Sequence, residues 1–172
     1  LVFDVFGTLV DWRRGIALEA GTALRLTGQG NTLTAEITPD WGQGRATFGG
    51  LLAALGLRAL DRVSAGQPLR SFAVNFVAPV AAGECGIDVE LLRSGRSLLH
   101  AEARLRQGGE VCAVLLAAYG GSRATRLRAP AAPAPEVTGP DQVQRLPFLP
   151  EMMPACLQHF DLRWTSAYYP FS

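Results

Sequence analysis

The segment from Phe48 to Leu57 restricts the fold of this chain more than any other stretch, because it is apolar on every side. It reads Phe-Gly-Gly-Leu-Leu-Ala-Ala-Leu-Gly-Leu, and charge appears only afterwards, at Arg58, Asp61 and Arg62. A helix without a polar face must be enclosed by other elements. We therefore expect one buried helix of roughly 15 residues, with Thr47 as its cap.

Strand-like segments with a single apolar face flank this helix in the sequence. Residues 32–38 alternate strictly between apolar and polar side chains before it, which is typical of a half-buried strand. Four further strands are expected after it, over residues 69–77, 84–92, 97–106 and 111–119. Ser94-Gly95 and Gly108-Gly109 are predicted to form two-residue hairpin turns.

The alternation assigns the faces of these strands. The side chains expected to face the core are Leu33, Ala35, Ile37, Cys85, Ile87, Val89, Leu91, Leu99, Ala101, Ala103 and Leu105. On the opposite face, Asp88 and Glu90 are placed to pair with Arg104 and Arg106. The pattern predicts an α+β fold, in which an antiparallel sheet wraps round one helix.

Composition excludes several classes of protein. The chain has 172 residues, a formal net charge of +1 and 48% hydrophobic residues, so it is neither a disordered chain nor a strongly basic nucleic-acid binder. All 16 basic residues are arginine, which excludes lysine chemistry. The apolar run at 48–57 is too short to span a membrane, and Asp4 interrupts the N-terminal apolar run, so we expect no signal peptide. Three scattered cysteines favour a reducing, cytoplasmic location and no metal site.

Several motifs in order along the chain resemble the N-terminal half of the acyl-CoA thioesterase II-like proteins, which are double hot dogs. The matching stretches are Thr47-Phe48-Gly49-Gly50, 69–79 (Leu-Arg-Ser-Phe-Ala-Val-Asn-Phe-Val-Ala-Pro), 89–97 (Val-Glu-Leu-Leu-Arg-Ser-Gly-Arg-Ser) and Ala117-Ala118-Tyr119-Gly120. The resemblance covers residues 20–121 and implies a hot-dog fold.

The rest of the chain divides around this segment. Residues 123–150 contain six prolines and are expected to form a Pro/Ala-rich linker. The stretch from Gln158 to Trp164 resembles the first strand of a second hot dog. We expect the chain to divide into an N-terminal fragment at 1–16, a hot-dog domain at 17–122, the linker at 123–150 and an incomplete second hot dog at 151–172. On this interpretation the chain is a truncated double hot dog.

The resemblance implies hydrolysis of a fatty acyl-CoA thioester to a free acid and CoA, as part of fatty acid metabolism, with no cofactor or metal. The backbone N–H groups of Gly49 and Gly50 are candidate oxyanion donors; alternatively, these glycines only let the helix enter a crowded core. Candidate substrate contacts are Phe48, Asn75, Arg93 and Arg96.

Leu51 to Leu57 contains no acidic residue that could activate water. A second interpretation is therefore a non-catalytic acyl- or CoA-binding half. The expected partners are an acyl-CoA and either a second copy, as a homodimer, or another hot-dog half; no nucleic acid or membrane partner is expected.

The N-terminus carries a different motif. Phe3-Asp4-Val5-Phe6-Gly7-Thr8 resembles motif I of the haloacid dehalogenase superfamily, in which the residue matching Asp4 is the nucleophile. Phe6, in place of an acid, favours the 2-haloacid dehalogenase branch. Because no alternation of strands and helices follows, we expect residues 1–16 to be a passenger segment.

Overall fold

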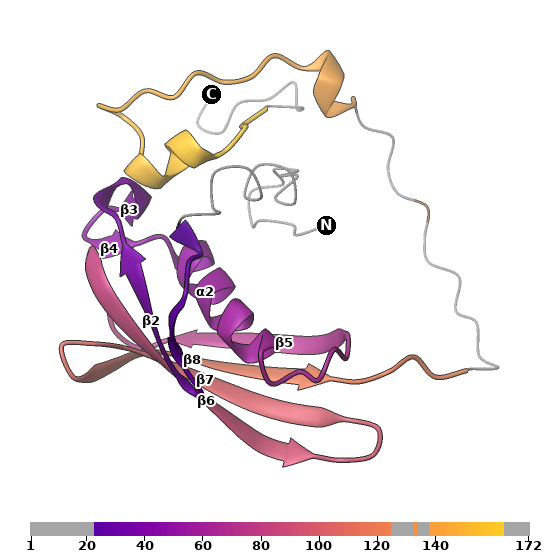
Figure 1. Cartoon of the computed structure of the whole chain (residues 1–172). Coiled ribbons are helices and arrows are strands. Elements are labelled where there is room, and N and C mark those ends of the chain that lie inside the picture. The colour runs from indigo at the N-terminus through magenta and orange to yellow at the C-terminus, as the bar shows by residue number, and fades with distance from the viewer. Residues whose placement is uncertain (1–22, 125–132, 134–137, 164–172) are drawn as a thin grey trace.

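The computed structural model describes residues 23–124, 133 and 138–163. One helix and one sheet dominate this part of the chain (Figure 1). The elements are β1 (Thr27–Gln29), β2 (Thr32–Ile37), η1 (Pro39–Trp41), β3 (Gly42–Gln43), β4 (Ala46–Thr47), α2 (Gly49–Asp61), β5 (Leu69–Phe76), β6 (Gly83–Ser94), β7 (Leu99–Gln107), β8 (Glu110–Tyr119), η2 (Pro140–Gln142) and η3 (Ala155–His159). The predicted motif at Asp4 lies outside the described residues, as do residues 125–132 and 134–137 of the predicted linker.

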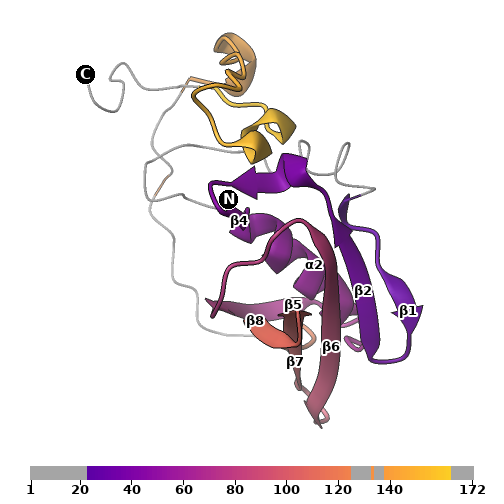
Figure 2. The ribbon, with the colours of Figure 1, turned by 90° about the vertical axis from the view of Figure 1, so that its left-hand side faces the viewer.

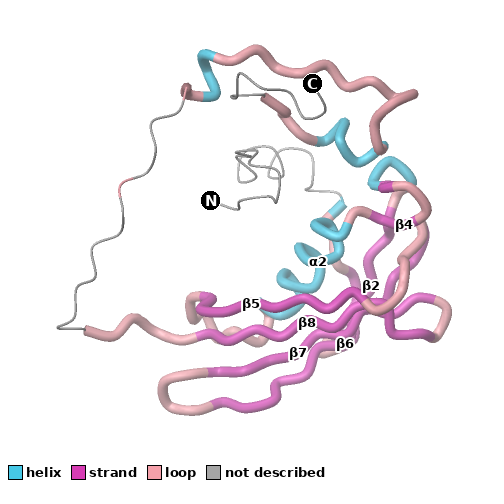
Figure 3. The backbone as a smooth tube through the Cα atoms, turned by 180° about the vertical axis from the view of Figure 1, so that it is seen from behind, coloured by secondary structure: helices cyan, strands magenta, loops and turns pink. Residues whose placement is uncertain are grey.

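The sheet is antiparallel and six-stranded, in the order β1-β2-β6-β7-β8-β5. It curves so that α2 lies against its concave face (Figures 1 and 2). Strand β5, which follows the helix in the chain, pairs with β8 alone among the described strands and forms one edge of their sheet (Figure 3). The predicted arrangement of an antiparallel sheet around one helix is therefore confirmed.

The core lies between α2 and the concave face of the sheet. Leu51, Leu52, Leu55, Gly56, Ala59 and Leu60 of the helix are buried. They pack with alternate residues of β2, β6 and β7, which the sequence assigned to the inner face, and with buried residues of β8. Leu91 keeps the predicted face, because it pairs in register with the fully buried Ala101, but it is 44% exposed. The register between β6 and β7 shifts only after it, between Leu91 and Arg93.

Two predicted details at the ends of elements are wrong. The helix is capped by Phe48, not Thr47, and no side chain bonds to the free amides of its first turn. Thr47 is instead held in β4, where its amide donates to the carbonyl of Val80 at 2.7 Å. The β6–β7 turn spans residues 95–98 rather than Ser94-Gly95, with the amide of Gly95 donating to the carbonyl of Leu98 at 2.9 Å.

The Gly108-Gly109 turn is confirmed. Both glycines have positive φ, 60° and 87°, which is the conformation that a two-residue turn requires and that other residues adopt at a cost.

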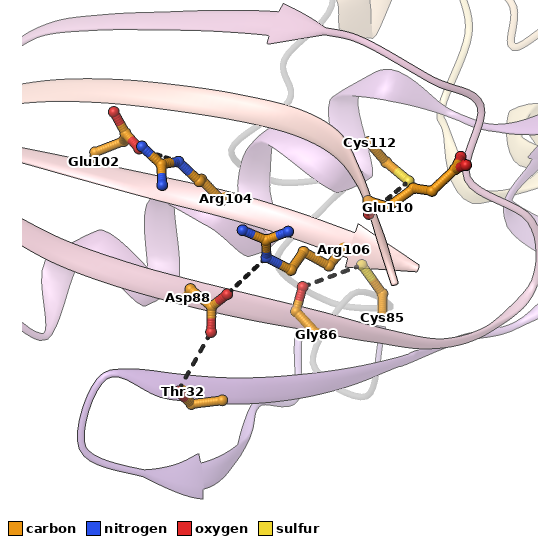
Figure 4. Close-up of polar contacts among 9 residues, drawn as sticks. All are labelled: Thr32, Cys85, Gly86, Asp88, Glu102, Arg104, Arg106, Glu110 and Cys112. Atoms are coloured by element: carbon orange, nitrogen blue, oxygen red, sulfur yellow. Dashed lines mark hydrogen bonds and ion pairs between the residues drawn. The ribbon is translucent and has the colours of Figure 1, made fainter. Parts of the chain in front are cut away.

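The outer face of the sheet carries the charged side chains, and their predicted pairing is confirmed for Asp88 but not for Glu90 (Figure 4). Arg106 donates to Asp88 at 2.9 Å, and Asp88 also accepts from the hydroxyl of Thr32 at 3.3 Å. Arg104 pairs with Glu102 of its own strand. Glu90 lies opposite Glu102 in the register, so it does not face an arginine.

The C-terminal described segment is not the strand expected over 158–164. Gln158 and His159 belong to the 3-10 helix η3, and Arg163 forms an isolated bridge with Arg145. The amide side chain of Gln158 donates to the carbonyls of Asp40 and Ala155. These contacts favour a tight turn against η1 over an extended strand.

Candidate functional site

The start of α2 presents free backbone donors. The amide of Phe48 donates to the carbonyl of Trp41 at 2.9 Å, which fixes the entry to the helix. The carbonyl of Phe48 accepts from Leu51 at 3.0 Å. Within the described part of the chain, no acceptor bonds the amides of Gly49 and Gly50, as is usual for the first turn of a helix.

A cavity of about 300 Å³ adjoins Gly49. Its lining comes from three places: the strand before the helix, the helix itself, and the end of β5 with the loop that follows it. The lining residues are Ala46, Thr47, Gly49, Leu52, Phe76, Val77, Ala78, Pro79 and Val80. The cavity is thus largely apolar, with a helix N-terminus in its wall.

Gly49 and Gly50 each lie close to an aromatic ring. A Cβ on Gly49 would lie 2.9 Å from the ring of Phe76, and a Cβ on Gly50 would lie 2.3 Å from the ring of Phe48. The crowding supports a structural role at Gly50, whereas Phe76 is 57% exposed and its ring can move away from a Cβ at Gly49. A structural role is compatible with a role for the amides of the two glycines, because the same absence of a side chain leaves the backbone approachable.

The structure does not bring all predicted site residues together. Phe48 lies beside the two glycines. Asn75 is exposed on β5 and pairs in register with Val114, so it lies on the face of the sheet opposite to Phe72 and Val74, which contact the core. Arg96 lines a cavity at the far end of α2, whereas Arg93 does not line it.

Comparison with known proteins bears on this arrangement. Residues 37–120 match the model of the acyl-CoA thioesterase N-terminal domain. No functionally curated protein matches the sequence.

Solved structures show the same fold. A hot-dog protein of unknown function from Alicyclobacillus acidocaldarius is 26% identical, with a TM-score of 0.64 over 80% of this chain and 51% of its own. A protein provisionally assigned as a thioesterase, from Novosphingobium aromaticivorans, is 27% identical, with a TM-score of 0.62 over 73% of this chain and 51% of its own.

The acyl-CoA thioesterase II TesB2 of Mycobacterium marinum is 21% identical, with a TM-score of 0.59 over 72% of this chain and 46% of its own. The chain has a thioesterase-like hot-dog fold. It spans about half the length of these three proteins.

Sequence reasoning missed one polar cluster of this hot dog. The imidazole Nε2 of His159 lies 2.9 Å from a carboxylate oxygen of Asp40, and its ring stacks on Trp41 with centroids 4.1 Å apart. Phe160 then contacts both Trp41 and Phe48 edge-on. No local sequence pattern indicates this cluster, because Asp40 and His159 lie far apart in the chain.

The thiols of the hot dog are unsuited to nucleophilic catalysis. Cys85, Cys112 and Cys156 are all buried. Burial, together with the nearby Cys112, raises the pKa of Cys85 to about 11, and burial also raises the pKa of Cys156. Within the described residues, no three potential metal ligands gather, and no helix is long and apolar enough to cross a membrane.

Proposed function

We propose that this chain belongs to an acyl-CoA thioesterase, which hydrolyses a fatty acyl-CoA thioester to a free acid and CoA. The match of residues 37–120 to a thioesterase domain supports this activity. The geometry that supports it best is the pair of free amides at Gly49 and Gly50, next to an apolar cavity.

The amides supply the electrostatic part of the reaction. When water attacks a thioester, negative charge develops on the carbonyl oxygen, and preorganised N–H donors stabilise that charge. The N-terminus of a helix adds a partial positive charge of its own. In this proposal the amides of Gly49 and Gly50 donate hydrogen bonds to the thioester oxygen, and the ring of Phe48 lies beside the reacting group.

Of the remaining predicted contacts, Asn75 lies on the outer face of β5 next to Phe76, and Arg93 and Arg96 lie at the β6–β7 turn. They would meet other parts of the substrate or a second hot-dog unit. The proposal requires no metal and no cofactor besides the CoA of the substrate, and places the protein in the cytoplasm. The exposed edge of β5 is the surface on which we expect a second hot dog, as a homodimer or as another half, to pair.

A pair of substitutions at one position tests the role of the amide. Gly49 is the first helical residue, where proline is tolerated, and the extended conformation of Phe48 (φ −54°, ψ 122°) suits a residue before proline. Gly49→Ala and Gly49→Pro both place a Cβ against Phe76, but only proline removes the N–H. We expect Gly49→Pro to lower kcat by about 10²-fold or more relative to Gly49→Ala in a thiol-release assay. Equal kcat in the two folded variants would contradict the role of this amide.

One observation favours the alternative of an acyl- or CoA-binding half without turnover. Helix α2 has no carboxylate before Asp61, which lies at the opposite end from Gly49. The same assay with acyl-CoAs of several chain lengths separates the two functions. Thiol release supports hydrolysis, whereas binding of CoA without thiol release supports the binding half.

A further inference from the structure

A second polar site lies at the opposite end of α2 from Gly49. Here the β6–β7 turn, the end of β8 and the start of β5 come together (Figures 1 and 3). Two adjoining cavities of about 380 and 500 Å³ open at this end and share the residues from Ser97 to Leu98 and from Gly120 to Arg123.

Three arginines from three separate segments line these cavities. Arg96 comes from the β6–β7 turn, Arg123 from the chain after β8, and Arg70 from β5. The guanidinium of Arg70 donates to the carbonyl of Gly120 at 2.6 Å and to the hydroxyl of Ser122 at 3.2 Å. Among the described residues, none of these three arginines forms an ion pair.

The rest of the lining suits an anion. It contributes the hydroxyls of Ser94, Ser97 and Ser122 and the side-chain amide of Gln67, and among the described residues it contains no aspartate or glutamate. Tyr119 also lines it, but its hydroxyl is engaged, because it donates to Asp61 at 3.0 Å. Uncompensated arginines in a hollow focus a positive potential, and guanidinium groups match the geometry of phosphate oxygens.

A cavity beside η1 has the opposite character. It measures about 640 Å³, and its described lining includes the carboxylates of Glu36, Asp40 and Glu84, with Arg25 and His159 as its basic residues. Phosphate groups would be repelled there. The different charges that line the cavities at the two ends of the fold favour the arginine-lined cavities as the binding site of an anionic ligand.

We propose that the cavities lined by Arg70, Arg96 and Arg123 bind phosphate groups. The proposed function supplies one source, the nucleotide end of CoA, whose phosphates are separated from the thioester by a long pantetheine arm; a free diphosphate is the other. Only the choice of CoA as source rests on the proposed function. The phosphate site itself rests on the lining of the cavities.

Calorimetric titration of the full chain tests the site with inorganic pyrophosphate, CoA, 3′-dephospho-CoA and pantetheine. Arg96→Gln and Arg123→Gln are the informative variants, because neither side chain makes a hydrogen bond to another residue that the structure describes. Arg45→Gln, an exposed arginine outside these cavities, is the control. We expect each informative variant to weaken binding of the phosphate-bearing ligands about tenfold or more, as loss of a charged hydrogen bond does, and the control to leave it unchanged.

The outcomes separate the site from the proposed function. If CoA binds more tightly than pyrophosphate and pantetheine does not bind, the site and its source both stand, whether or not thioester is hydrolysed. If pyrophosphate binds as tightly as CoA, the site stands and a free diphosphate is its ligand. Failure of the wild-type chain to bind any phosphate-bearing ligand, or equal binding by wild type, Arg96→Gln and Arg123→Gln, would overturn the proposal.

Discussion

At the scale of single residues, the core holds ionisable groups in their neutral form. Cys85 is fully buried on β6, and desolvation followed by the nearby Cys112 raises its pKa to about 11. Burial and the hydrogen bond to Asp61 raise the pKa of Tyr119 well above its ordinary value. Because both groups ionise less readily in the folded chain than in the unfolded chain, the free energy of unfolding should fall as the pH becomes alkaline.

The raised pKa of Cys85 leads to a prediction of how the stability of the protein depends on pH. The pKa of this thiol is higher in the folded than in the unfolded chain, so its contribution is complete below about pH 8.5, the usual pKa of a cysteine. That contribution falls as pH rises toward 11, by at most about 1.4 kcal/mol per pH unit. We expect Cys85→Ala to lower stability at pH 8 but to flatten its decline between pH 9 and pH 11. Urea unfolding at each pH measures this; parallel declines for the two proteins would contradict it.

At the scale of elements, the fit of α2 on the sheet depends on a small residue in the middle of the helix. Gly56 is buried, and a Cβ there would lie 2.5 Å from a methyl group of Leu115 on β8. Leu115 is itself fully buried, so it has little room to move away. The glycine costs helix propensity but permits the close approach of helix and sheet.

We expect Gly56→Ala to destabilise the protein by about 1–3 kcal/mol, because overpacking outweighs the gain in helix propensity. Shortening the facing side chain should relieve the clash. In the double variant Gly56→Ala/Leu115→Val, the loss should therefore be smaller than the sum of the two single losses. Chemical unfolding of the four proteins measures the coupling. Strict additivity would show that Leu115 does not oppose the added methyl group.

At the scale of the whole molecule, the sheet ends in an exposed edge. Strand β5 has one neighbour in the described part of the chain, and its residues are mostly exposed, with Phe76 57% and the adjoining Val77 63% accessible. Unpaired strand edges with apolar side chains are templates for pairing with another strand. We expect this edge to hold the second hot dog.

Charge at the middle of β5 tests that expectation for a homodimer. A two-fold pairing of β5 with itself brings the two copies of Ala73, near the strand's midpoint, close together. We expect Ala73→Lys and Ala73→Glu each to dissociate a dimer, and a mixture of the two variants to restore it, because like charges repel across paired strands and opposite charges attract. Sedimentation velocity measures this.

The control for that experiment is Leu116→Lys, since Leu116 is exposed on the neighbouring β8 but is not at the edge. It should leave the dimer intact. Dissociation by Leu116→Lys alone, with no effect of either Ala73 variant, would place the interface on the outer face of the sheet instead.

Local patterns made the fold predictable to a large extent. The alternation of Ile87 and Val89 with Asp88 places the first two in the core, and the apolar run from Phe48 places the helix, because burial follows the periodicity of each element. The same reasoning overestimated the burial of Leu91, which is 44% exposed, and failed at the β6–β7 turn, where the structure has a longer turn. It also could not show that Asp88 pairs with Arg106 and not with Arg104, which lies directly opposite it.

The sequence by itself determined the kind of fold and the glycine-led start of the helix, because both depend on residues close together in the chain. Only the tertiary structure decided which distant residues meet. It stacked His159 on Trp41 and gathered Arg70, Arg96 and Arg123 at one end of the sheet. The reason is physical: strand register and sheet curvature set such meetings, and no short-range pattern encodes either of them.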